Sequence, residues 1–101
     1  MISAELARKA LRAVKDPELG LNIIDIGLIY DLDIDEAGVV HVTMTLTSPG
    51  CPVGAEIMAD VRQTLAELEG VTSVDLELVW EPPWTPALMS ESARGFFGWN
   101  S

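Results

Sequence analysis

Two short runs of alternating apolar and polar residues, joined by a tight turn, constrain the fold of this chain most strongly. A period of two is typical of a strand with one buried face. The DEAG between the runs contains turn-forming residues, so we expect an antiparallel hairpin with one wet face. The apolar face should consist of Leu28, Tyr30, Leu32, Ile34, Val40, Val42, Met44 and Leu46. The wet face should carry Asp31, Asp33, His41, Thr43 and Thr45.

Two other segments have helical spacing. A helix from about Ala4 to Val14, capped by Ser3, should end before Pro17. Its predicted apolar stripe is Leu6, Ala7, Ala10, Leu11 and Val14. The second helix should start with Pro52 in its first position and end near Gly70. Its stripe is Val53, Ile57, Val61, Leu65 and Leu68. Residues 16–27 fit no period and are expected to form a packed loop.

A third alternating run, residues 71–80, predicts one more strand, with Val74, Leu76, Leu78 and Trp80 on its apolar face. The order helix, strand, strand, helix, strand, short helix predicts an α+β two-layer sandwich, in which helices cover one face of a small mixed three-stranded sheet. The whole chain, residues 1–101, should be a single domain. From about residue 81 a tail rich in proline and aromatic residues should pack back on the domain or form an interface. A short helix is expected from Pro86 to about Arg94.

The chain is acidic and has one cysteine. Sixteen acidic residues against six basic ones give a net charge of −10, which argues against nucleic acid and anionic membranes as partners. No apolar run has the length of about 20 residues needed to cross a bilayer, and the start does not resemble a signal peptide. We therefore expect a cytoplasmic protein.

The cysteine, Cys51, lies in TSPGCPVGAEI, between a strand and a helix. If Pro52 opens the helix, Cys51 is the N-cap or its neighbour, where backbone N–H groups and the helix dipole favour the thiolate. A buried, inert cysteine is the competing interpretation. As a nucleophile, Cys51 would need a base, and His41, the one histidine, is expected on an exposed strand face. As a metal ligand, one thiol is too few for a closed site, so any metal or cluster would be shared or transient.

Three blocks, DPELGLNIIDIGLIYDL, VTMTLTSPGCPVGAEI and VDLELVWEPPWTPALMSESAR, resemble the metal–sulfur cluster biosynthesis family in the same order. This is the SufT- and PaaD-like iron–sulfur cluster assembly domain, formerly a domain of unknown function. The resemblance implies that fold and a role in maturing iron–sulfur proteins. It places the reactive cysteine at Cys51, an acidic pair at Asp16 and Glu18, and a threonine at Thr47. Without the resemblance, the two acids read as a solvated helix stop. The absence of a second cysteine toward the C-terminus favours the SufT-like form.

Three functions are compatible with these observations. The first is an assembly or targeting factor, not an enzyme, that works with iron–sulfur assembly proteins and client apoproteins. It would hold no permanent cofactor but could bind iron or a cluster transiently through Cys51, and a homodimer would supply a second thiol. The second is a thiol enzyme that uses Cys51 as its nucleophile. The third is a pure adaptor that docks through its aromatic tail.

Overall fold

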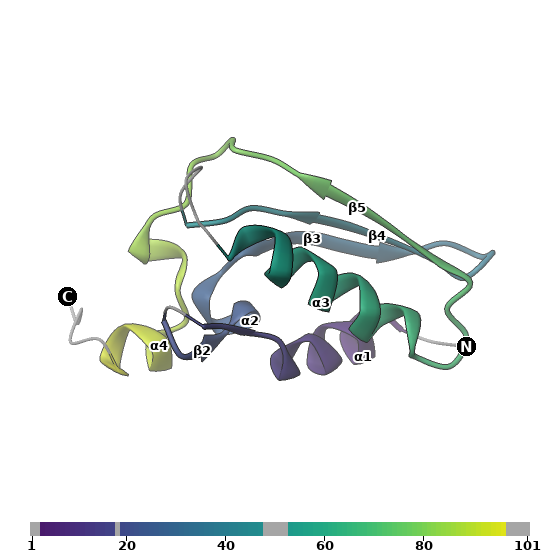
Figure 1. Cartoon of the computed structure of the whole chain (residues 1–101), viewed down its shortest axis with the longest axis horizontal. Coiled ribbons are helices and arrows are strands. Elements are labelled where there is room, and N and C mark those ends of the chain that lie inside the picture. Colours follow the sequence, from purple (N-terminus) through teal and green to yellow (C-terminus); the bar gives the residue numbers. More distant parts are fainter. Residues whose placement is uncertain (1–2, 18, 48–52, 97–101) are drawn as a thin grey trace.

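The computed structural model of the protein describes residues 3–17, 19–47 and 53–96. Helices pack against one face of a sheet, and the described helices leave its other face open (Figure 1). The predicted α+β two-layer sandwich is therefore confirmed. Among the described residues, no helix has the length and apolar character required to span a membrane.

The first helical segment begins and ends close to its predicted limits. Helix α1 spans Ala4–Ala10 and continues as a 3-10 turn, η1, over Leu11–Ala13. The Ser3 hydroxyl accepts a hydrogen bond from the Leu6 backbone N–H at 3.1 Å, as expected of an N-cap. Leu6 itself was wrongly predicted to be in the core, because its side chain is 51% exposed. The stripe that faces the core starts one residue later, at Ala7.

The segment predicted as an irregular loop contains regular structure. Strands β1, Lys15–Asp16, and β2, Leu21–Asn22, form a small antiparallel pair, and helix α2 follows directly over Ile23–Ile26. The Asn22 side chain caps α2 by accepting from the Asp25 N–H at 2.9 Å. Gly27, with φ of 88°, ends the helix in the left-handed region.

The main sheet has the order β3-β4-β5 and is mixed. Strand β3, Ile29–Ile34, pairs antiparallel with β4, Val39–Met44, and β4 pairs parallel with β5, Ser73–Leu78. A register shift between Ile29 and Asp31 allows both Leu28 and Ile29 to be buried, although strict alternation placed only Leu28 inside.

One residue of the expected wet face is buried at the end of the hairpin. Thr45 is fully buried, so its predicted exposure was wrong. Its hydroxyl lies beside that of Tyr30, and the Tyr30 hydroxyl donates to the Pro82 carbonyl at 2.7 Å. The tail therefore reaches this end of the hairpin.

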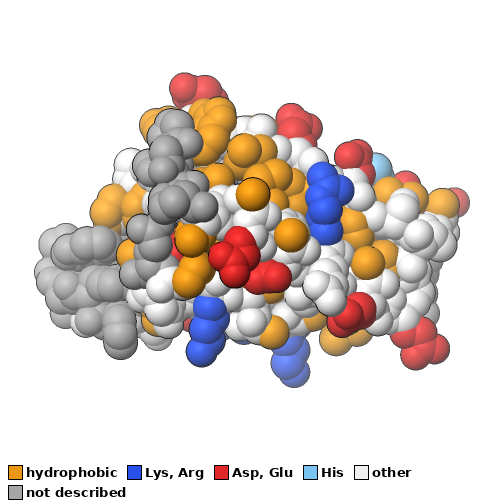
Figure 2. Space-filling view, in the orientation of Figure 1, with side chains coloured by type: hydrophobic (Ala, Val, Ile, Leu, Met, Phe, Trp, Pro, Cys, Tyr) orange, Lys and Arg blue, Asp and Glu red, His pale blue; other side chains and the backbone are white. Residues whose placement is uncertain are grey.

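Helix α3, Gly54–Ala66, connects β4 to β5. It begins two residues after the predicted first position, with Val53 as its N-cap. Its buried residues are Gly54, Ile57, Val61 and Leu65, so the predicted stripe is largely right. Hydrophobic side chains also reach the surface between β5 and α3 (Figure 2).

The tail packs against α2. It contains a 3-10 turn, η2, over Pro86–Leu88 and helix α4 over Glu91–Phe96, where one helix was expected. The Trp84 indole N–H donates to the Ile26 carbonyl at 2.8 Å, and the Ser90 N–H donates to the Asp25 carbonyl at 2.7 Å. Trp84 therefore packs back on the domain.

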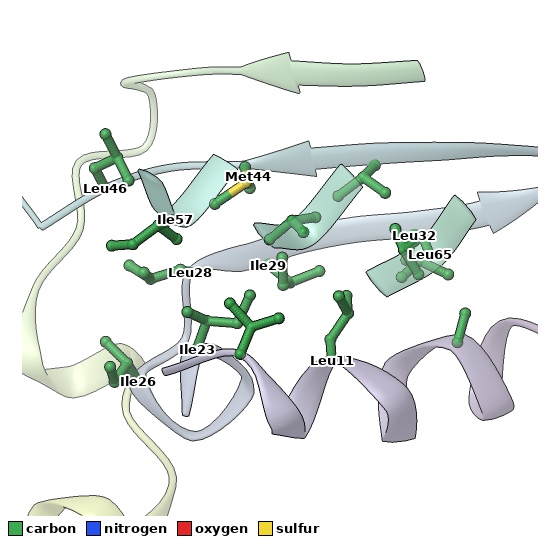
Figure 3. Packing of buried hydrophobic residues seen from close by; sticks show 14 of the residues in the cluster. Leu11, Ile23, Ile26, Leu28, Ile29, Leu32, Met44, Leu46, Ile57 and Leu65 are labelled. Carbon is green, nitrogen blue, oxygen red and sulfur yellow. The ribbon is translucent and has the colours of Figure 1, made fainter. Parts of the chain in front are cut away.

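The core lies between the sheet and the helices. Figure 3 shows side chains from different elements meeting between the sheet and the helices: Leu11, Ile23, Met44 and Ile57. All four are fully or almost fully buried. Met89 and Ala93 of the tail belong to the same cluster, so the tail completes the core.

Candidate functional site

The segment that carries Cys51 connects the end of the central strand β4 to the start of α3. Cys51 and Glu18 lie outside the described residues, so their contacts and their proximity stay predictions. The residues on either side of the segment are described. Leu46 is 6% exposed, and Gly54 packs so closely on it that an added Cβ would lie 2.6 Å from Leu46 Cδ1. The two ends of the segment are thus held together by core packing.

The N-cap residue of α3, Val53, makes no side-chain capping hydrogen bond. Val53 offers no side-chain acceptor, and no side chain caps the first turn from that position. The first N–H groups of a helix have no partner within the helix and carry its positive partial charge. This end of α3 therefore suits an anionic group, such as a thiolate. Thr47, half-buried, lies just before the undescribed segment.

Asp16 is not the solvated helix stop that its sequence context suggests. It is 1% exposed, in β1. Its backbone carbonyl accepts from the N–H groups of Leu19 at 3.2 Å and Gly20 at 2.8 Å, which forms a turn at the tip of the β1-β2 pair. A buried carboxylate is costly unless it is paired or hydrogen-bonded, and the functional role that the resemblance gives to Asp16 stays a prediction.

His41 is held by two carboxylates on the open face of the sheet. Its Nε2 lies 3.1 Å from Asp35 Oδ2, and its Nδ1 lies 3.3 Å from Asp75 Oδ2. The hydrogen bond to Asp35, followed by that to Asp75, raises the pKa of His41 above its ordinary 6.5. The hydrogen bond from His41 is also the largest of the causes that lower the pKa of Asp35. His41 is exposed, as predicted.

Asp25 is a residue whose structural role was missed from the sequence. It accepts from Arg12 Nη1 at 3.2 Å and from Asn22 Nδ2 at 3.0 Å. Together with its backbone contact to the tail, these bonds tie η1, α2 and the tail together. The spacing of Asn22, Asp25 and Gly27 was the available signal, because it is a helix cap followed by a helix stop.

Two surface depressions are lined by described residues of the N-terminal part of the chain and the tail. One, of about 500 Å³, is lined by residues of α1, α2, β3 and the tail. The other, of about 380 Å³, lies along α1. They share Arg8 and Ile24, and neither is lined by Asp16 or Thr47. Within the described ranges, no three potential metal ligands of the His, Cys, Asp or Glu type come together.

Comparisons with known proteins agree with the fold and with the sequence resemblance. Residues 5–76 match the family described as iron-sulfur cluster assembly protein. The chain is 49% identical over 85 residues to the Fe-S protein maturation auxiliary factor YitW of Bacillus subtilis, with 84% of this chain and 83% of that one covered. It is 46% identical over 81 residues to the Fe-S protein maturation auxiliary factor SufT of Staphylococcus aureus, with 80% and 92% covered.

A solved structure shows the same architecture. The crystal structure of a domain of unknown function, DUF59, from Bacillus anthracis matches with a TM-score of 0.91 at 38% identity. The match covers 96% of this chain and 92% of that one. The predicted resemblance is therefore confirmed, and this chain belongs to the iron–sulfur cluster assembly protein family.

Proposed function

We propose that this chain is a SufT-like factor that helps to mature iron–sulfur proteins, and that the Cys51 thiolate is its reactive group. The observation that carries the proposal is the position of the cysteine segment. It leads into the start of α3, where the N-cap residue Val53 makes no side-chain capping hydrogen bond, and Leu46 and Gly54 hold its two ends together. Two relatives, 49% and 46% identical over the residues that they match, are named Fe-S protein maturation auxiliary factors.

The start of α3 would favour the charged form of the thiol. The dipole of a helix and its unsatisfied N–H groups lower the pKa of a cysteine placed at its N-terminus. Asp16 and Glu18, if they lie beside Cys51 as the family resemblance implies, act in the opposite direction, because a nearby carboxylate disfavours a second negative charge. The relative sizes of these opposing effects set the reactivity of the thiol, which alkylation measures directly.

The single thiol of each chain limits how it could bind iron or a cluster. A cluster requires about four ligands, so Cys51 alone would hold an iron only while other ligands come from elsewhere. A client apoprotein, an assembly protein or a second copy of this chain would supply them. The proposal is therefore brief ligation during transfer rather than storage.

A thiol hydrolase is less well supported. Such an enzyme needs a histidine within hydrogen-bond reach of the sulfur. His41 instead binds Asp35 and Asp75 toward the hairpin turn, whereas the cysteine segment leaves the opposite end of β4. The contacts of His41 and the position of the cysteine segment can both be explained without a reaction of a bound substrate.

Alkylation tests the state of the thiol directly. Because the chain has a single cysteine, iodoacetamide should add one label to the native protein, and the mass of the intact protein measures that addition. The rate plotted against pH gives the thiol pKa. Reaction should proceed at a rate within about tenfold of a free thiol at the same pH. A thiol that reacts only after unfolding would contradict the proposal and favour the adaptor.

A maturation assay tests whether Cys51 is needed for the maturation of iron–sulfur proteins. In cells that depend on this chain, Cys51→Ser should leave the protein folded but lower the activity and cluster absorption of an iron–sulfur enzyme to the level of the deletion. Ser92→Ala, an exposed change on α4, is the matched control and should behave as wild type. Full maturation with Cys51→Ser would refute a role for the sulfur.

A further inference from the structure

Strand β5 leaves one edge of the sheet open. It pairs with β4 on one side, and no described strand pairs with its other side. Figure 1 shows it at the border of the sheet. An open edge presents unpaired backbone groups and can accept another strand.

The register tells which backbone groups point outward. Met44 is opposite Leu78, and the Val79 N–H donates to the Met44 carbonyl at 2.9 Å. A strand bonds to one neighbour through alternate residues. Residues 75, 77 and 79 therefore bond to β4. The N–H and C=O groups of Val74, Leu76 and Leu78 point away from it.

The side chains of β5 form two rows with different chemistry. Val74, Leu76 and Leu78 are partly buried against the core on the side of α3, and Met58 of α3 is also partly buried there. Hydrophobic side chains are visible at the surface between β5 and α3 in Figure 2. On the opposite face, Asp75 and Glu77 are exposed. A strand added to this edge would therefore meet apolar side chains on one face and carboxylates on the other.

This pattern disfavours a second copy of the chain as the added strand. In an antiparallel pair centred on Leu76, Asp75 of each copy faces Glu77 of the other. Centring the pair on residue 75 or 77 places identical acids opposite each other. Like charges directly opposite in a sheet are destabilising, and each copy already carries a net charge of −10.

We propose that the outer edge of β5 binds an extended segment of a partner protein in which apolar and basic residues alternate. The apolar residues would extend the row of Leu76 and Leu78, and the basic residues would pair with Asp75 and Glu77. Because β4 and β5 are parallel, this edge ends beside the end of β4, from which the cysteine segment leaves. The docking surface does not depend on the chemistry proposed for Cys51.

Peptide binding to the full chain tests this surface. The probes are two short capped peptides, one alternating valine with lysine and the other valine with glutamate, measured by calorimetry at low salt. The lysine peptide should bind roughly tenfold more tightly, and the amide protons of Leu76 and Leu78 should gain protection from hydrogen exchange. Equal affinity for both peptides, or no binding of either, would overturn the proposal.

Two variants separate edge pairing from general attraction to an acidic protein. Asp75→Lys combined with Glu77→Lys should reverse the preference, so that the glutamate peptide binds more tightly. Leu76→Pro removes an N–H that points outward and places a ring at the edge, without removing a bond to β4, and should abolish binding. Unchanged binding by a folded Leu76→Pro would refute the edge. A concentration-dependent dimer that this variant abolishes would assign the edge to a second copy instead.

Discussion

The contact between Gly27 and the tail allows a sharp test of how the tail is held. Gly27 has φ of 88°, and an added Cβ would lie 2.8 Å from the carbonyl carbon of Leu88. The added Cβ would also clash with the Leu88 carbonyl oxygen, and these backbone atoms cannot rotate away as a side chain can. Gly27→Ala should therefore force the segment at Leu88 away from α2.

The expected loss of stability follows from two terms. A residue with a side chain in the left-handed region costs about 1–2 kcal/mol, reduced by about 0.4–1 kcal/mol because alanine restricts the unfolded chain. Overpacking against Leu88 adds about 1–3 kcal/mol. Gly27→Ala should therefore lose about 1–5 kcal/mol of stability, compared with the roughly 5–15 kcal/mol typical of a domain.

Gly20→Ala is the matched control, because Gly20 has φ of 74° but nothing within 4 Å of the added Cβ. Without overpacking, it should lose only about 0–2 kcal/mol. Urea unfolding followed by circular dichroism gives both values. Proteolysis should also cut the tail of Gly27→Ala faster. If the two variants lose the same stability, close packing of Leu88 on Gly27 does not hold the tail.

Two further changes test contacts seen in the structure. Because the pKa of His41 is raised in the folded chain by Asp35 and then Asp75, its contribution to stability should be complete below pH 6.5 and fall as pH rises through the folded pKa. His41→Gln should flatten this dependence in urea unfolding at several pH values, and an unchanged slope would contradict it. Trp84→Phe removes the hydrogen bond to the Ile26 carbonyl and should cost about 1 kcal/mol, whereas a neutral result by the same measurement would show that the bond contributes nothing.

Much of the sheet could be predicted from alternation alone. The apolar face of β4 is as expected because Val40, Val42 and Met44 point at the helices in regular register. Alternation fails where the register shifts, since a bulge after Ile29 changes which residues face inward without any change in composition. Thr45 is buried because Tyr30 and the tail cover that end of the strand, and contacts between distant segments have no local signal.

The candidate site was predictable in part. The strand, the cysteine segment and the helix were expected in the observed order, because each has a strong local pattern. The preference of Pro52 for the first turn predicted a start there, but the helix begins at Gly54, which packs closely on Leu46. The burial of Asp16 depends on the β1-β2 pair, which is too short to produce a periodic pattern.

The close contact of Leu46 with Gly54 has a consequence for the evolution of this domain. Because Leu46 and Gly54 are both buried and Val53 packs against the core, exchange of residues 48–52 should disturb folding less than exchange of these flanking residues. Loops that are fixed at both ends by a rigid scaffold are where new specificities arise. Descendants of one scaffold could thus acquire different binding specificities through substitutions in a few consecutive codons, while the sheet and helices remain unaltered.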